Sequence, residues 1–268
     1  MNHKITILSL LFLASSLQAF SLKENEDSWQ KWGPATGLTG GGFIVRAGYV
    51  IGGTTPVPLP AEIRKINSFS PKGGVSLGID GYRMFSKRWG IGVGAHFFWE
   101  GFRTNADVKN YYTWVKQGDN VIKGYYTGTS NTSTEMWGVT VPLFATFRIC
   151  PRWNLSFGPY LSYYFKQTFK GEVYDNKDGI GYLREGSPVG PKIEANRSNP
   201  LPYPEDMADD MLPLSTGVEV GFDWKAMRRM NVFGLLDWGL TNIWGPEFKA
   251  ISFKMFPIYA TVGVAYRY

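Results

Sequence analysis

The sequence has few of the features that mark the commoner classes of membrane and secreted protein. After residue 19, no stretch approaches the roughly 18 uninterrupted apolar residues by which a transmembrane helix is recognised. Cys150 is the only cysteine among 268 residues, so no internal disulfide can form. The chain has only 2 histidines, which leaves no histidine–cysteine cluster for zinc. These absences exclude a bundle of membrane helices, a disulfide-stapled domain and a zinc site of that kind.

The charge balance gives no sign of a nucleic-acid partner. The formal net charge is +6, and the basic residues are scattered along the chain rather than gathered in one patch. The acidic stretch from Asp175 to Gly179 is similar to a calcium loop, but Lys177 stands where such a loop needs an oxygen ligand. We therefore expect no nucleic acid, no metal and no cofactor.

The N-terminus has the organisation of a secretory signal peptide. Lys4 supplies a positive n-region, Ile5 to Leu13 form an apolar h-region, and Leu17-Gln18-Ala19 give a small-residue cleavage pattern. The apolar run is much shorter than the roughly 20 residues that a spanning helix needs. We predict that residues 1–19 are a signal peptide cleaved after Ala19, and that residues 20–40 form a periplasmic segment.

Aromatic residues and glycine are abundant, at 16% of the chain and 32 positions respectively, and they occur in an alternating pattern. The pattern is clearest in residues 89–100. One set of positions there is Trp89, Ile91, Val93, Ala95, Phe97 and Trp99, and the other is Gly90, Gly92, Gly94, His96, Phe98 and Glu100. Such alternation is typical of a strand with one face toward lipid and the other toward a narrow interior.

Seven further segments of similar length alternate in the same way. They are Phe43–Ile51, Gly74–Phe85, Met136–Ile149, Trp153–Lys166, Leu214–Trp224, Val232–Ile243 and Phe256–Tyr268. About ten residues is the length with which a tilted strand crosses a bilayer. The pattern predicts an all-β fold with eight spanning strands in residues 41–268.

The connections between these segments alternate between short and long. Short turns lie near residues 86–88, 150–152 and 225–229, whereas the other connections, residues 52–73, 101–135, 167–213 and 244–252, are longer. Outer-membrane barrels have short periplasmic turns and long extracellular loops. We therefore predict a transmembrane, antiparallel, up-and-down β-barrel of about eight strands.

Aromatic residues separate this prediction from a secreted β-sandwich, whose strands also alternate. Tryptophan and tyrosine favour the two membrane–water interfaces. They recur near the predicted strand ends, as Trp89, Trp153 and Trp224 do at the short-turn end and Trp99 and Trp137 do at the other. This distribution favours the barrel.

Several stretches carry a family resemblance. They are Gly41-Gly42-Phe43 through Gly52-Gly53, Pro56 to Pro60 with Ala61-Glu62-Ile63-Arg64, Lys72-Gly73-Gly74, Phe85-Ser86-Lys87-Arg88-Trp89-Gly90, and the terminal aromatic. In these stretches the chain resembles PorT-like "porin family" outer-membrane β-barrel proteins of Bacteroidota. The resemblance covers most of Phe43 to Tyr268 and implies an integral protein of the cell outer membrane.

The same resemblance implies partners. Tyr266 and Tyr268 would be the C-terminal signal that the barrel-assembly machinery recognises, and outer-membrane lipid and lipopolysaccharide would surround the barrel. The founding PorT is associated with type IX protein secretion, which implies partners in the envelope or in secretion. The family pattern supplies no functional residue to carry over.

The alternation places ten ionisable residues on the inward face of the predicted barrel. They are Arg46, Asp80, His96, Glu100, Arg148, Lys166, Glu219, Asp223, Asp237 and Arg267. The interior of an eight-stranded barrel is only about wide enough for side chains to fill it. We therefore expect a charge network that closes the lumen, and the alternative is a narrow pore for ions or small solutes lined by the same groups.

Catalysis is a weaker interpretation of these residues. His96 and Glu100 would share one inward face, and a histidine–carboxylate pair can act in general acid–base chemistry. A packed interior would keep substrate away from them, so we expect no enzyme. Function is instead expected in the long loops, above all residues 167–213, because loops on a rigid scaffold carry recognition. We predict a closed scaffold with a role in surface recognition, the envelope or secretion.

Overall fold

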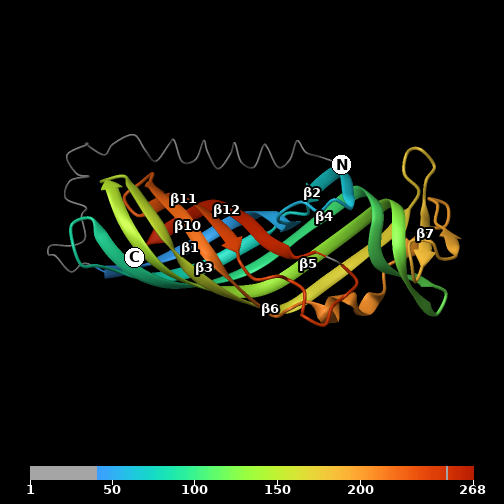
Figure 1. The fold of residues 1–268 in the computed structure, drawn as a ribbon. Coiled ribbons are helices and arrows are strands. Elements are labelled where there is room, and N and C mark those ends of the chain that lie inside the picture. The colour runs from blue at the N-terminus through green and yellow to red at the C-terminus, as the bar shows by residue number, and fades with distance from the viewer. Residues whose placement is uncertain (1–40, 252) are drawn as a thin grey trace.

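A computed structural model describes residues 41–251 and 253–268 (Figure 1). The predicted signal peptide, its cleavage after Ala19 and the segment 20–40 lie outside the described residues. No helix in the described ranges is long and apolar enough to cross a membrane.

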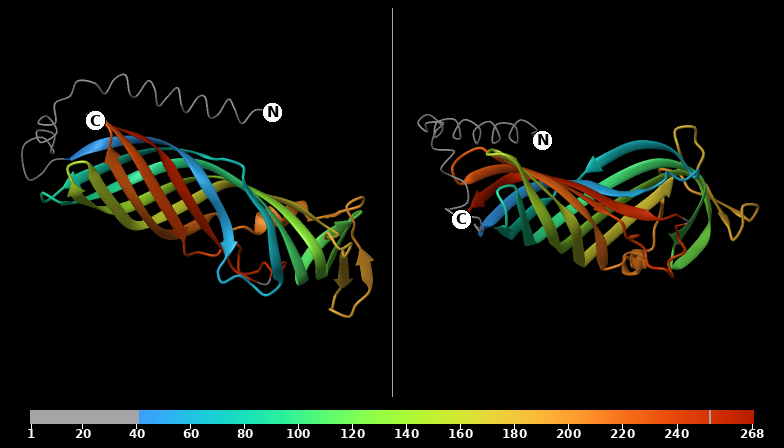
Figure 2. Two further views of the ribbon diagram at one scale, coloured as in Figure 1. Left: turned by 90° about the horizontal axis from the view of Figure 1, so that it is seen from above. Right: turned by 60° about the vertical axis from the view of Figure 1, so that its left-hand side comes forward.

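Eight antiparallel strands close into a ring, as predicted. Their order around the ring is β1, β3, β4, β5, β6, β10, β11, β12 and back to β1. Their bounds are β1 Gly41–Pro56, β3 Val75–Met84, β4 Trp89–Gln117, β5 Asn120–Cys150, β6 Trp153–Tyr174, β10 Leu214–Lys225, β11 Met230–Gly239 and β12 Met255–Arg267. Each spanning segment expected from the alternation lies within one of these strands or overlaps most of it. The C-terminus lies at the end where β1 begins (Figure 2).

Period-two burial explains why these sequences form a barrel. In β4, Ile91 and Val93 are each 51% exposed on the outer surface, whereas Gly90, Gly92 and Gly94, which alternate with them, are buried. Glycine is required at one inward position, since a Cβ at Gly92 would collide with the ring of Phe144. Large apolar side chains outside and small or polar ones inside suit a strand between lipid and a narrow lumen.

Three strands run far past the ring. β4, β5 and β6 are 29, 31 and 22 residues long, and Figure 1 shows them continuing beyond the barrel as a curved sheet. The short strands β2 (Ile63–Pro71), β7 (Tyr182–Glu185), β8 (Lys192–Glu194) and β9 (Leu201–Pro202) extend this sheet. We call the part beyond the barrel the outer module. It also includes the 3-10 helix η2 (Glu205–Asp210) and the connection between β11 and β12.

The outer module differs from the loops that the sequence predicted. Residues 101–135 form a continuous hairpin of β4 and β5, with a two-residue turn at Gly118 and Asp119. Much of 167–213 is also paired, through the end of β6 and through β7, β8 and β9. The connections are therefore long, as expected, but ordered by strand pairing.

A hydrophobic core explains this order. Val115, Tyr126, Val173 and Leu183 are fully buried in the outer module, in one hydrophobic cluster with Met207 of η2 and residues of the β11–β12 connection. The same cluster continues down to Phe98 and Tyr164 at the outer end of the barrel. The outer module therefore has a core of its own, continuous with the barrel.

Candidate functional sites

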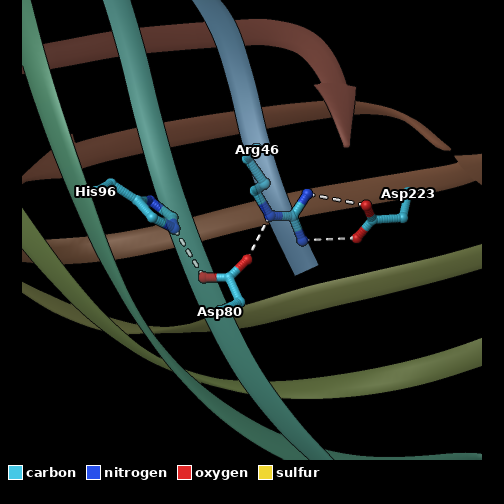
Figure 3. Close-up of polar contacts among 4 residues, drawn as sticks. All are labelled: Arg46, Asp80, His96 and Asp223. Atoms are coloured by element: carbon cyan, nitrogen blue, oxygen red, sulfur yellow. Dashed lines mark hydrogen bonds and ion pairs between the residues drawn. The ribbon is translucent and has the colours of Figure 1, made fainter. Parts of the chain in front are cut away.

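Arg46 is the centre of a buried ionic cluster in the barrel. Its guanidinium donates from Nη1 and Nη2 to the two carboxylate oxygens of Asp223, at 2.8 and 3.0 Å. Its Nε also donates to Asp80, so one cation from β1 joins carboxylates from β3 and β10 (Figure 3). The Cζ atom of the guanidinium also lies 4.8 Å from the centroid of the Phe233 ring. A bidentate fork of this kind holds arginine in one geometry.

His96 extends this cluster to β4. Its Nε2 lies 2.8 Å from Oδ1 of Asp80 (Figure 3), and the histidine, like Asp80, is buried. Asp80 therefore links His96 to Arg46 across neighbouring strands. The imidazole contacts Asp80 rather than Glu100, the partner that its sequence position suggested.

Three acids lie nearer the outer end of the barrel. Glu219 and Asp237 stand directly opposite each other in the pairing of β10 and β11. Glu100 and Asp237 line one cavity of about 30 Å³, together with Tyr160, Tyr164 and other side chains. That volume holds about one water molecule. No group of three His, Cys, Asp or Glu in the described part of the chain is arranged to hold a metal ion.

Two of the predicted cations lie near the short-turn end. Arg148 and Arg267 line a second cavity, of about 20 Å³, beside Asp223. The side chain of Arg267 also lies over the ring of Tyr82, at 5.2 Å. These cations are half-buried, unlike Arg46.

Lys166 was placed wrongly by the alternation, because its side chain is exposed. The pairing of β5 with β6 changes register between Trp137, which is opposite Lys166, and Gly138, which is opposite Tyr164. Such a β-bulge adds one residue to one strand and reverses the faces beyond it. Tyr164, before the irregularity, faces inward like Ser162, whereas Lys166, beyond it, lies outside the interior.

The charged cluster and an aromatic plug occupy the interior of the barrel. At the outer end, Phe98 and Tyr164 make an edge-to-face contact at 5.5 Å, and Met136 is fully buried beside them. From this plug toward the short-turn end, the interior holds first Glu100, Glu219 and Asp237, and then His96, Asp80 and Arg46. The two barrel cavities described above each hold no more than about one water molecule.

The outer module contains a much larger cavity that the sequence did not predict. Its volume is about 400 Å³, and we call it the outer pocket. One face of the β4–β5 hairpin forms its floor through the paired residues Phe102 and Thr134, Thr104 and Thr132, and Ala106 and Ser130. Phe169, Ile251, Phe253, Met255 and Ile258 add apolar walls.

β2 forms a wall with an unusual spacing. Ile63, Ile66 and Phe69 all line the outer pocket, although they are three residues apart. Each stands opposite an alternate residue of β4, because β2 has two register irregularities, after Ile63 and after Ile66. Asn67, in the second irregularity, bonds instead to Asn105 and Asp107 on the opposite face of the sheet. Bulges thus convert a three-residue spacing into one apolar face.

Hydroxyl side chains also line the outer pocket, at Thr54, Thr55, Thr104, Ser130, Thr132 and Thr134. Thr54 of β1 lines it and is only 6% exposed, and its Oγ1 has no hydrogen-bond partner within the described structure. Buried hydroxyls normally have a partner. The Oγ1 atom of Thr54 is enclosed by protein and does not face the pocket space.

No rule of strand alternation could have found the outer pocket. Its floor on β4 and β5 does alternate, but β2 breaks the period at two bulges. The useful signal was the recurrence of Ile63, Ile66 and Phe69 within residues 62–70, which are otherwise polar.

The comparison with protein families decides the class of the molecule. The family described as "Outer membrane protein beta-barrel domain" matches residues 31–245. The chain belongs to this family. Together with the eight-stranded ring, this places the protein in the outer membrane as an integral β-barrel, with short turns in the periplasm and the outer module outside the cell.

Solved outer-membrane barrels resemble this member of the family only distantly. Ail, the attachment invasion locus protein of Yersinia pestis, is 10% identical, with 85% of this chain and 99% of that chain covered and a TM-score of 0.36 in its complex with sucrose octasulfate. OprG from Pseudomonas aeruginosa is 15% identical, covering 85% and 96%, with a TM-score of 0.35. Neisserial surface protein A is 12% identical, covering 85% and 99%, with a TM-score of 0.37. A search of curated proteins finds no match.

Proposed function

We propose that this outer-membrane barrel is a closed scaffold that captures a small apolar ligand at the cell surface. The observation that carries the proposal is an apolar pocket of about 400 Å³ in the outer module, above a filled barrel. Pockets for small ligands measure about 300–1,000 Å³ and combine apolar walls with a few polar groups. The outer pocket fits that description, with threonine and serine side chains such as Thr104, Ser130 and Thr132 among its apolar lining.

A narrow pore for ions or small solutes is the rival function. It would need a continuous path past Arg46, whose guanidinium bonds two carboxylates across the lumen. A sizeable aqueous channel normally takes about 16 strands. The filled lumen therefore favours the closed scaffold, and we propose no catalytic role for His96, which is enclosed in the same cluster.

The narrower family assignment is also part of this proposal. We infer a PorT-like protein of Bacteroidota, exported by the predicted signal peptide and assembled through Tyr266 and Tyr268. Both tyrosines are exposed at the end of β12, in edge-to-face contact at 5.6 Å, so they are accessible to the assembly machinery. Partners in the envelope or in secretion would meet the outer module or the periplasmic turns.

A pull-down tests the partners. The β7–β8 hairpin, residues 182–194, projects from the sheet edge (Figure 1) and pairs only with β5 among the main strands. We expect envelope partners to be captured by the full chain and lost when the hairpin is replaced by a short turn. Equal capture by both forms would remove this hairpin from the recognition surface.

Photolabelling tests ligand capture directly. A diazirine derivative of octanol, added to purified protein in an amphipathic polymer, should label the residues of the outer pocket. Thr132→Trp fills the pocket from its floor and should weaken labelling more than about tenfold, because it removes the space for the ligand. Ser133→Trp, on the other face of the same strand, is the matched control and should leave labelling unchanged. Equal labelling in both variants contradicts the proposal, provided that both remain folded by circular dichroism.

A further inference from the structure

We propose that the occupant of the outer pocket is the acyl chain of a lipid of the outer leaflet, which enters sideways between β1 and β2. The inference rests on the proposed capture of an apolar ligand and names that ligand. It is carried by an opening in the strand pairing and by apolar side chains exposed at that opening.

The opening lies where the ring of strands separates. β1 pairs with β3 only as far as Tyr49, and Val50 donates one further bond to Gly74. From Gly52 to Pro56, β1 pairs with β12 on one side and with no described strand on the other. β2 likewise pairs only with β4. The outer pocket lies behind the two unpaired edges, with Gly52, Pro56, Ile63 and Phe69 in its lining.

The surface at this opening is apolar and exposed. Leu59, Ile66 and Phe69 are 56%, 50% and 47% exposed, and all three line the outer pocket. A group of large apolar side chains left open in this way marks an interaction site. The outward apolar residues of β1 run up to Ile51, and the pocket lining begins at the next residue, Gly52. The outward apolar face of β1 and the pocket lining therefore adjoin at this point of the chain, and we infer that an acyl chain passes from one to the other.

Phe69 lies across the opening. A Cβ at Gly53 would lie 2.9 Å from its ring and 3.0 Å from the ring of Phe102, so glycine lets both rings pack against the backbone of β1. The rings of Phe69 and Phe102 are stacked at 6.0 Å. Because Phe69 is half exposed and no backbone bond holds β2 to β1 here, its side chain can turn aside.

The test uses lipid as the probe. The full chain is placed in nanodiscs of phosphatidylcholine doped with phosphatidylcholine that carries a diazirine at the end of one acyl chain, and adducts are mapped by mass spectrometry after illumination. We expect adducts on β2 and on the pocket face of β4, besides those on Val93 and Leu143, which face lipid and serve as the internal reference. Thr132→Trp should abolish the pocket adducts and keep the reference adducts, while Ser133→Trp keeps both.

Phe69→Ala tests the route. Removing the ring should raise pocket labelling relative to the reference, whereas unchanged labelling would overturn entry past Phe69. If the octanol derivative labels the pocket and the lipid does not, ligand capture stands and the lipid assignment is wrong. If neither labels it, both fail. Adducts or crosslinks between two copies of the chain at β2 would instead assign the opening to self-association.

Discussion

Arg46 is the residue on which the closed lumen depends most. It compensates two carboxylates in a place where few water molecules fit, and the three residues come from strands that are distant in sequence. Breaking a buried ion pair by removing one partner costs about 3–5 kcal/mol, because the other charge stays buried and unpaired. The cluster therefore fixes the strands to one another as well as filling the space between them.

The first prediction follows from this cost. Arg46→Met keeps the apolar stem and removes the charge, so the free energy of unfolding in lipid vesicles should fall by about 3–5 kcal/mol. Lys166→Met is the control, because this exposed lysine should contribute within about 0.5 kcal/mol. Adding Asp80→Asn and Asp223→Asn to Arg46→Met should recover part of the loss. An equal, small effect of both single variants in urea titrations would show that the cluster is not structural.

Tyr203 gives a second prediction, for the outer module. Burial raises the pKa of Tyr203 to about 12 from 10.0, and its hydroxyl lies 2.8 Å from Oγ of Ser130. The folded state therefore favours the neutral phenol. The stability from this group is fully present below pH 10 and is lost as pH rises through about 12.

An alkaline titration checks this sign. Near-ultraviolet circular dichroism should show the outer module loosening between pH 10 and 12, and Tyr203→Phe should reduce that dependence. The variant should also cost about 0.5–1.5 kcal/mol at neutral pH for the lost hydrogen bond. Tyr268→Phe, at the exposed C-terminus, should alter neither property. A steeper alkaline loss in Tyr203→Phe would contradict the assignment.

Among the elements, the β4–β5 hairpin carries the outer module. Its turn places Gly118 at φ +61°, a conformation that side chains with a Cβ adopt at a cost of about 1–2 kcal/mol. Gly118→Val should therefore raise the amide exchange rates of residues 121–125 by roughly fivefold or more. Asp119→Val, at the neighbouring turn position, has no positive φ and should change exchange less. Equal exchange in both variants would mean that the turn does not hold the hairpin.

The strands of the barrel were predictable from sequence because each has an inner and an outer face. Residues such as Ile91 and Gly92 alternate over a whole strand, so eight segments could be located without long-range information. The register irregularities could not be located in this way. The extra residue in β6 reversed the placement of Lys166, and two irregularities in β2 hid the apolar face of Ile63, Ile66 and Phe69.

The outer module was hidden for a related reason. Its residues are polar enough that the sequence predicts loops. Its core depends on η2 and the β11–β12 connection, which are distant in sequence from β4 and β5. Similarly, alternation could point Arg46 and Asp80 inward, but only the three-dimensional register places Asp223 within reach of the same guanidinium. The face on which a side chain lies follows from its own strand, whereas the residue that it contacts depends on how distant strands pair.

The whole molecule has two compartments with opposite chemistry. The barrel encloses charged side chains and cavities of about 30 and 20 Å³, and the outer module has mostly apolar side chains around a cavity of about 400 Å³. A pore would have the reverse distribution, with open space in the membrane part. We therefore expect the protein to function at its outer surface and not to conduct ions or solutes.

Planar-bilayer recording tests this central claim most directly. The folded protein should insert without producing a stable unitary conductance, and a barrel of about 16 strands recorded under the same conditions serves as the positive control. Recovery of folded protein from the bilayer lipid verifies that insertion took place. We predict that no conductance steps will be recorded. A stable unitary conductance that Asp80→Asn or Arg148→Gln abolishes would contradict it, because those side chains would then line a pore.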